Sequence, residues 1–330
     1  MQPFTLARPA SLEEATRLAA AGAMPLAGGT ELLNWMRLGI AAPARLADIS
    51  RLPGLDAIAP LPDGGLSLGA LARLNDVAAH PAVRAGYPVL RQAIHKAASA
   101  QLRNLATIGG NLLQKTRCAY FRAEESLPCN RRAPGSGCAA LHGLNERHAI
   151  FGWTEACVAT QPSDPAVALA ALDAVVVVAG PAGARRIPLG DLHLLPDAAG
   201  AAADTALRAG EIIVAIELPG PAPRSAYLKI RERESYEYAL VSAAGALVLD
   251  GRTIRRARLA LGSVAMKPWR LPAAEAALAG LSLDDTAALR AALEPAFAEA
   301  RPLSHNGYKV PLARNAALRV IGMIAEGHAP

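Results

Sequence analysis

The sequences PLAGGTE at residues 25–31 and ATIGGN at residues 106–111 decide the fold of this chain, and we call them glycine loop 1 and glycine loop 2. Each has a short apolar stretch, two adjacent glycines, and then a polar residue or a predicted helix start. Paired glycines let the backbone approach a ligand, and successive N–H groups near a helix start suit a phosphate or pyrophosphate. Either loop alone is more often an ordinary tight turn. The repeated pattern makes the two interpretations equal.

The commoner phosphate-binding signatures are absent from the sequence. It contains no G-x-x-x-x-G-K-[ST] motif, which excludes a Walker A loop. It also has no G-x-G-x-x-G after a predicted strand, so a Rossmann dinucleotide site has no support. A dinucleotide bound here requires another architecture.

Helices and short strands alternate along most of the chain. Ser11 and Glu14 form a capping box for a helix ending near residue 21, and Thr30 is a candidate cap for a helix over 31–38. Hydrophobic periodicity predicts further helices over 87–102, 165–172, 272–279, 284–300 and 311–326. Strands are predicted over 24–27, 46–49, 66–68, 106–108, 174–179 and 211–218, with a hairpin of 239–249 and 253–261 on a type I′ turn at Asp250-Gly251.

Composition bounds the class of protein. The chain has 330 residues, of which 52% are hydrophobic and 19% charged, so it can bury a large core and is not globally disordered. The net charge of +6 is spread along the chain, which favours a partner surface or an anionic cofactor over nucleic acid. The longest apolar stretch, 165–179, is interrupted by Asp173 and is shorter than the about 20 residues that a bilayer needs. The first residues lack an export signal, so we expect a cytoplasmic chain unless a signal-bearing partner carries it to the periplasm.

Four cysteines lie close together in a segment, residues 115–157, that shows no helical or strand periodicity. They are Cys118, Cys129, Cys138 and Cys157. Two disulfides are possible, although a chain of this size does not need them. A zinc site usually has a C-x2–4-C pair, which is missing here, whereas an iron–sulfur cluster takes four thiolates at wide spacing. Nearby basic residues and glycines favour an anionic cluster, and His142 and His148 are not expected as ligands because four thiolates complete a site.

Six motifs together resemble one family. They are LAGGTEL (26–32), LRNLATIGGNLL (102–113), QPSDPAVALAALDA (161–174), GEIIVAIELP (210–219), AYLKIRERESYEYALV (226–241) and LVLDGRTIRRARLALGSVAMKPWR (247–270). The chain resembles the FAD-binding medium subunits of the molybdenum hydroxylases, the xanthine dehydrogenase and aldehyde oxidoreductase family. The resemblance implies an α+β fold. A two-subdomain FAD-binding domain of the vanillyl-alcohol-oxidase (PCMH) type would span residues 1–222, with an insert at about 115–157. A smaller α+β domain with an antiparallel sheet and helices would span residues 223–330.

The same resemblance implies which residues contact FAD. They are Pro25, Leu26, Ala27, Gly28, Gly29, Thr30, Glu31, Leu32, Thr107, Ile108, Gly109, Gly110, Asn111, Gln114, Ser163, Asp164, Ile213 and Lys229. Loop 1 would hold the pyrophosphate through backbone N–H groups, and loop 2 would form the opposite wall. Asp164 would bind a polar edge of the nucleotide. Tyr236 and Tyr238 either shade the flavin or pack on a strand face.

The cysteine motifs TRCAYFR, CNRR and GSGCAALHG resemble a narrower group, the bacterial periplasmic aldehyde oxidoreductases whose FAD subunit also binds a 4Fe–4S cluster. This resemblance implies that the four cysteines are the cluster ligands. It further implies an electron-transfer subunit of a heterotrimer, with a 2Fe–2S small subunit, a molybdopterin large subunit that oxidises the substrate, and an external electron acceptor. No catalytic residue is expected on this chain.

The sequence leaves three alternatives to this interpretation. The first is an FAD subunit of a related enzyme, such as xanthine dehydrogenase or 4-hydroxybenzoyl-CoA reductase. The second is a free-standing flavin oxidase, and the third is a zinc or disulfide module. A flavin oxidase requires its own acid–base group, and often a His or Cys flavin tether, and neither is visible in the sequence. A zinc or disulfide module leaves the two glycine loops without a ligand.

Overall fold

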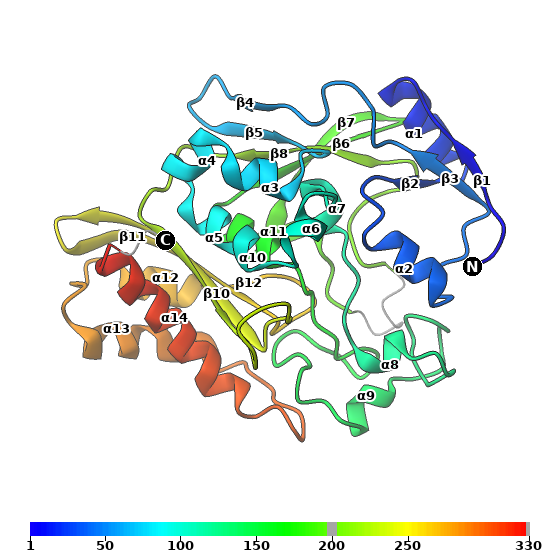
Figure 1. The fold of residues 1–330 in the computed structure, drawn as a ribbon. Helices are drawn as coiled ribbons and strands as arrows, with labels where there is room; N and C mark the ends of the chain where they lie inside the picture. Colours follow the sequence, from blue (N-terminus) through cyan, green and yellow to red (C-terminus); the bar gives the residue numbers. More distant parts are fainter. Residues whose placement is uncertain (197–202, 328–330) are drawn as a thin grey trace.

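The computed structural model describes residues 1–196 and 203–327 as a mixed helix and sheet protein with three sheets (Figure 1). The N-terminal sheet is parallel and contains β1 (Thr5–Ala7), β3 (Arg45–Asp48) and β2 (Met24–Leu26), in that order. Helix α1 (Leu12–Ala20) begins as predicted, since the Ser11 side chain accepts a hydrogen bond from the Glu14 N–H at 3.1 Å. The predicted cap at Thr30 is wrong, because Glu31 precedes α2 (Leu32–Arg37) and no side chain caps that helix.

The larger sheet is antiparallel and forms the centre of the region that precedes residue 222. Its strands are β4 (Ile58–Pro60), β5 (Leu66–Gly69), β8 (Ile212–Leu218), β6 (Val175–Gly180) and β7 (Gly183–Pro188), in that order. The helices of this region are α3 (Leu74–Ala79), α4 (Pro81–Gly86), α5 (Pro88–Lys96), α6 (Ala100–Arg103), α7 (Ile108–Leu112), α10 (Asp164–Ala171) and α11 (Leu189–Leu192). Helices α3, α4 and α5 lie beneath this sheet in Figure 1, and one continuous aliphatic core lies between these helices and the sheet. Burial of this apolar surface is the main force that holds the region together.

Two predicted elements of this region are wrong. The predicted helix over 87–102 is two helices, because the chain turns at Ala98, which has a φ of 48°. Ser99 then caps the second helix by accepting a hydrogen bond from the Leu102 N–H at 3.2 Å. The predicted strand over 106–108 is only an isolated bridge between Thr107 and Arg73, and α7 begins at Ile108.

The C-terminal region has its own antiparallel sheet and its own core. The strands are β9 (Ser225–Ile230), β10 (Val241–Asp250), β11 (Thr253–Gly262) and β12 (Trp269–Arg270), and the helices are α12 (Pro272–Leu278), α13 (Thr286–Leu293), the 3-10 helix η1 (Glu294–Phe297) and α14 (Lys309–Ala325). The hairpin is confirmed, but its turn is Gly251-Arg252 and only Gly251 has a positive φ, so the type I′ turn is wrong. The predicted helix over 284–300 is α-helical only from Thr286 to Leu293 and continues as the 3-10 helix η1 from Glu294. Pro295 lacks the backbone N–H that an α-helix would need at this position.

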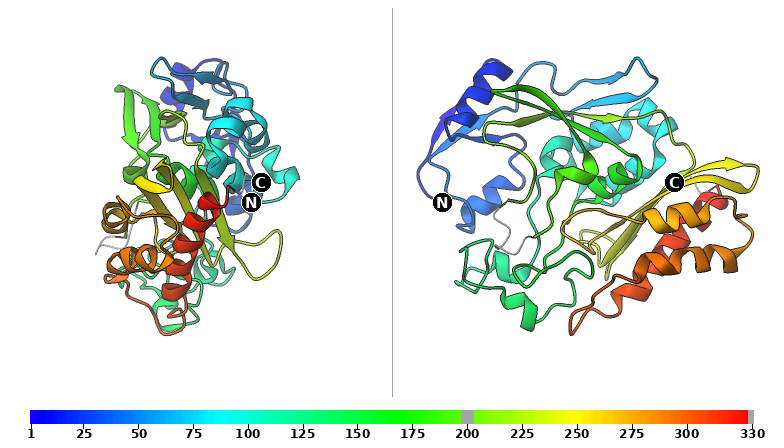
Figure 2. Two further views of the ribbon diagram at one scale, coloured as in Figure 1. Left: turned by 90° about the vertical axis from the view of Figure 1, so that its left-hand side faces the viewer. Right: turned by 180° about the vertical axis from the view of Figure 1, so that it is seen from behind.

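The segment 115–157 contains little regular structure, as predicted. It holds two single-turn helices, α8 (Ala119–Arg122) and α9 (Ala139–His142), together with isolated bridges between Cys129 and Cys138 and between Thr154 and Cys157. Figures 1 and 2 show it between α2 and the start of α14. It contacts both, since Arg117 pairs with Glu31 directly before α2 and Lys309 Nζ at the start of α14 donates to the carbonyl of His148. Among residues 1–196 and 203–327, no helix is long and apolar enough to cross a membrane.

Candidate functional site

The two glycine loops meet at one wall of a large cavity of about 620 Å³. Loop 1 follows β2 and loop 2 leads into α7, and the two touch at Gly28. A Cβ on Gly28 would lie 2.0 Å from the carbonyl oxygen of Leu105, so only glycine permits this approach. Sixteen of the eighteen predicted FAD contacts line this cavity; Ile108 and Ser163 do not.

Loop 1 exposes unused backbone donors. Within the described part of the chain, the N–H groups of Gly28, Gly29, Thr30 and Glu31 donate no hydrogen bond, although all four residues line the cavity. Gly29 has a φ of 69°, which favours glycine and turns the loop toward α2. A run of free N–H groups on a concave wall is suited to an anionic group such as a pyrophosphate.

Loop 2 has the same sequence pattern but its donors are already used. The N–H groups of Ile108 and Gly109 donate to the carbonyls of Ala72 and Ala70, each at 2.9 Å. The Gly110 N–H donates to the Thr107 hydroxyl at 3.2 Å, and the Asn111 N–H donates to the Thr107 carbonyl. Loop 2 is therefore a structural wall of the cavity, and the expectation that both loops share one design is wrong at the level of hydrogen bonding.

The two predicted contacts that miss the cavity have structural roles. Ile108 is fully buried in the core of the larger sheet. Ser163 caps α10 by accepting a hydrogen bond from the Ala166 N–H at 3.1 Å, and its hydroxyl lies 2.6 Å from Asn111 Oδ1. Ser163 thus holds the side chain of Asn111, which does line the cavity.

Asp164 lines the cavity, but both of its carboxylate oxygens have protein partners. The Tyr227 hydroxyl donates to Oδ1 at 2.5 Å and Lys229 Nζ donates to Oδ2 at 2.7 Å. Burial raises the pKa of Asp164, and these two donors oppose that effect. The group therefore connects α10 to β9 of the C-terminal region, a role that the resemblance did not suggest.

Further residues that line the cavity include Trp35 and Arg117, which were not predicted as contacts. Tyr236 and Tyr238 also line it, as one of their two interpretations expected. The two tyrosines stand between β9 and β10, outside any strand, so the strand-packing interpretation is wrong. The guanidinium of Arg117 lies 4.5 Å from the centroid of the Tyr238 ring. Only the alternating tyrosines gave a signal in the sequence.

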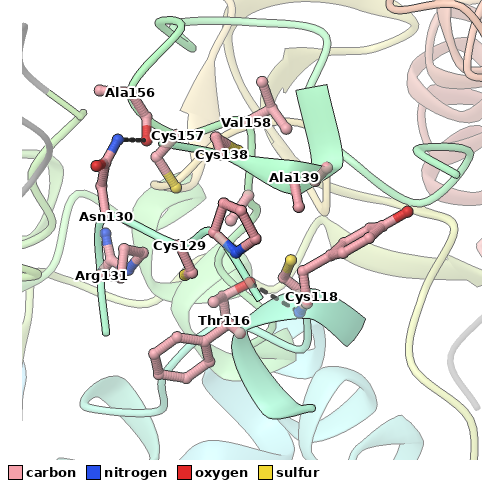
Figure 3. Close-up of a pocket in the computed structure, with 15 residues that line it drawn as sticks. Thr116, Cys118, Cys129, Asn130, Arg131, Cys138, Ala139, Ala156, Cys157 and Val158 are labelled. Atoms are coloured by element: carbon pink, nitrogen blue, oxygen red, sulfur yellow. Dashed lines mark hydrogen bonds between the residues drawn. The ribbon is translucent and has the colours of Figure 1, made fainter. Parts of the chain in front are cut away.

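The four cysteines converge on a second, much smaller cavity, which we call the cysteine cavity (Figure 3). All four are free thiols, and the cavity between them measures about 10 Å³ as the side chains stand, which is room for about one water molecule. Within the described ranges, no group of three or more His, Cys, Asp or Glu side chains is placed to hold a metal ion. The structure thus brings the predicted ligands to one place, and their role as cluster ligands stays a prediction.

The residues around the cysteine cavity are largely buried, and some of them are basic. Burial raises the pKa of Cys118 to about 12 and also raises the pKa of Cys157. Arg131 lines the cavity. His148 Nε2 lies 3.2 Å from Cys118 Sγ, and burial lowers the pKa of His148 to about 4. A buried, neutral imidazole here can donate a hydrogen bond to sulfur, a contact that the sequence did not reveal.

Comparison with known proteins accounts for both regions of the fold. The family described as the FAD binding domain in molybdopterin dehydrogenase matches residues 2–221, and the CO dehydrogenase flavoprotein C-terminal domain matches residues 226–324. The chain belongs to the FAD-binding medium subunits of the molybdenum hydroxylase family. This FAD-binding subunit is therefore part of an oxidoreductase. Most residues that line the large cavity lie within the segment that matches the FAD-binding domain.

Individual relatives cover almost the whole FAD-binding subunit. It is 46% identical over 325 residues to the aldehyde oxidoreductase FAD-binding subunit PaoB of Escherichia coli K12, covering 97% of this chain and 98% of that protein. The glyceraldehyde dehydrogenase medium chain of Sulfolobus acidocaldarius is 27% identical, covering 86% and 83% of the two chains. A solved structure of carbon monoxide dehydrogenase from Hydrogenophaga pseudoflava has a TM-score of 0.76 at 28% identity and covers 99% of both chains.

Proposed function

We propose that this chain is the FAD- and 4Fe–4S-binding electron-transfer subunit of a molybdenum-dependent aldehyde oxidoreductase. In this proposal it works with a 2Fe–2S small subunit and a molybdopterin large subunit, and it delivers electrons to an external acceptor. The observation that carries the aldehyde assignment is the 46% identity over 97% of the chain to an aldehyde oxidoreductase FAD-binding subunit. Its compartment follows that of the partner subunits, and is the periplasm where one of them carries an export signal.

The large cavity supports the flavin part of the proposal. FAD supplies two-electron and one-electron redox chemistry when bound. The chain's own residues bind and orient it: the free N–H groups of loop 1 hold the pyrophosphate, and Ile213, Tyr236 and Tyr238 offer walls for the ring system. Arg117 and Lys229 line the same cavity, but each pairs with a carboxylate that also lines it, Glu31 and Asp164 respectively. The free N–H groups of loop 1, and not a net positive charge, therefore favour an anionic group here.

The cysteine cavity supports the cluster part of the proposal. Its donor set has the type and number that a 4Fe–4S cluster requires, four thiols from one segment. Arg131 and His148 would stabilise negative charge on the sulfurs, by charge and by a hydrogen bond respectively. Room for the cluster requires the four thiol side chains to move apart, since the cavity between them now measures about 10 Å³.

One experiment tests both cofactors. The full chain is purified anaerobically and assayed for FAD, iron and acid-labile sulfide. The proposal expects about four iron and four sulfide per FAD. FAD without iron would refute the cluster, and a folded chain that takes up no FAD, alone or with its partner subunits, would refute the flavin assignment as well. Copurification with a molybdenum-containing subunit, and aldehyde oxidation by that complex but not by the single chain, distinguishes the proposal from a free-standing flavin oxidase.

A further inference from the structure

Glu31, the last residue of glycine loop 1, forms ion pairs with two arginines of residues 115–157, which we call the cysteine segment. Its Oε2 lies 2.6 Å from Arg117 Nη2 and its Oε1 lies 2.6 Å from Arg122 Nη2. Trp35 Nε1 also donates to Oε1 at 2.7 Å. The carboxylate is only 14% exposed, so solvent screens these ion pairs weakly. Residues almost ninety positions apart are thus connected by a partly buried charge network.

The two arginines lie on either side of the first cysteine. Arg117 directly precedes Cys118, and Arg122 ends the short helix α8 that follows it. Arg122 Nε also donates to the carbonyl of Thr116 at 2.9 Å, while the Thr116 hydroxyl accepts from the Cys118 N–H at 3.2 Å. Any change in the backbone around Cys118 therefore reaches Glu31 through side chains that contact it directly.

The other end of the network is the large cavity itself. Glu31, Trp35 and Arg117 all line it, and Arg117 lies over Tyr238, another lining residue. The N–H of Glu31 is one of the free donors of loop 1. The position of the Glu31 carboxylate thus fixes the end of the loop to which we assign the pyrophosphate.

We propose that Glu31 is a positioning residue that couples FAD binding to cluster loading, so that each cofactor strengthens the binding of the other. This inference rests on the proposed function, because it requires both cofactors on this chain. Replacing the carboxylate leaves two neighbouring guanidinium groups without their shared partner, and their repulsion loosens both the loop and the cysteine segment. Coupling between two sites is reciprocal and typically amounts to about 5- to 150-fold in affinity.

The test is a double-mutant cycle on the full chain, read out as FAD affinity. Cys138 is the ligand to change, because it does not line the large cavity and is not among the residues that contact Glu31. The wild-type chain, Cys138→Ser, Glu31→Gln and the double variant are stripped of FAD and titrated by quenching of flavin fluorescence, with iron and sulfide measured on each. We expect Cys138→Ser to lose iron and to bind FAD about 5- to 150-fold more weakly, and to have no further effect in the Glu31→Gln background.

A matched control separates coupling from general destabilisation. Glu275 is also 14% exposed and also pairs with an arginine, Arg270, but it does not line the large cavity. Glu275→Gln should leave both FAD affinity and iron content unchanged. The rate at which a chelator removes iron is a second measurement that needs no cysteine variant. In the wild-type chain this rate should rise after FAD is stripped. In Glu31→Gln it should be the same with and without FAD.

Each contrary result has a distinct meaning. A wild-type chain without iron overturns the cluster proposal and this inference together. Iron in the wild type, with equal FAD affinity in Cys138→Ser and equal chelation rates, overturns only the inference. A loss of FAD affinity in Cys138→Ser that persists in full in the double variant shows that coupling runs through other residues and overturns the role of Glu31.

Discussion

Glycine loops 1 and 2 have nearly the same sequence pattern and opposite structural roles. In loop 1, the N–H groups of residues 28–31 are free at the wall of the large cavity. In loop 2, the N–H groups donate to the carbonyls of Ala70 and Ala72 and to the hydroxyl and carbonyl of Thr107. The difference shows that paired glycines indicate a close approach between two backbone segments. Whether the loop can bind a ligand then depends on whether its N–H groups donate to that neighbouring segment or remain free. Gly28 approaches Leu105, which directly precedes loop 2, while Gly109 approaches Ala70, which directly follows β5.

The residues behind the two loops differ in the same way. Loop 1 ends at Glu31, whose carboxylate pairs with Arg117 and Arg122 of the segment 115–157. Behind loop 2 lie Ser163 and Asp164, which connect α7 to α10 and α10 to β9. Changes on the loop 2 side should therefore lower stability, and changes on the loop 1 side should lower ligand affinity.

The largest effect is expected on the loop 2 side, at Asp164. Asp164→Asn leaves the ammonium of Lys229, whose side chain is only 2% exposed, without its carboxylate. Removing one member of a buried ion pair costs about 3–5 kcal/mol, which urea unfolding of the FAD-free chain will measure. The double variant Asp164→Asn, Lys229→Met should recover much of that loss. Equal losses in the single and double variants would contradict the role of Lys229.

His193 gives the next largest effect, and it also belongs to the loop 2 side. Its Nε2 lies 2.8 Å from the carbonyl of Leu112 at the end of α7, and burial lowers its pKa to about 4 from 6.5. The unfolded chain binds the proton more readily between these values, so stability that is complete above pH 6.5 is lost as the pH falls toward 4. The shift corresponds to about 3 kcal/mol.

The measurement is urea unfolding of the FAD-free chain from pH 7.5 to 4.5, compared with His193→Gln. Other titrating groups, His148 among them, cancel in the difference between the two chains. The wild type should lose more stability than the variant over this window. Parallel curves would show that His193 does not carry the pH dependence.

An intermediate effect is expected at Gly28 on the loop 1 side. In Gly28→Ala the new Cβ would lie 2.0 Å from the Leu105 carbonyl oxygen, so the two loops must separate. Such overpacking costs about 1–3 kcal/mol, which corresponds to roughly 5- to 150-fold weaker binding of FAD in a fluorescence titration. Gly190→Ala is the control, since nothing lies within 4 Å of its added Cβ. Wild-type affinity in Gly28→Ala would refute the close approach.

Much of this could be predicted from the sequence, because motifs and periodicity report local geometry. The resemblance identified the domain order and sixteen cavity-lining residues. The N-cap at Ser11 was confirmed, but the Glu14 carboxylate accepts from the Ala10 N–H and not from the Ser11 N–H, so the capping box is only half formed. The break at residues 97–99 was missed because the apolar periodicity continues across it, although Ala97 and Ser99 are extended and Ala98 has a positive φ. The convergence of the four cysteines followed from their clustering in sequence, but the Glu31 network did not. Its members are almost ninety residues apart, and long-range ion pairs leave no local pattern.

The smallest effect compares the threonines of the two loops. The Thr107 hydroxyl accepts a hydrogen bond from the Gly110 N–H and caps α7, whereas the Thr30 side chain caps nothing and only its backbone carbonyl accepts a bond from Asn34. Thr107→Ala should therefore lower the free energy of unfolding by about 1 kcal/mol, and Thr30→Ala should change it by less than about 0.5 kcal/mol. Urea unfolding of the FAD-free chains measures both under one set of conditions. If the two variants lose equal stability, the Thr107 hydroxyl does not stabilise α7 as a cap, and this side-chain difference between the two loops has no energetic consequence.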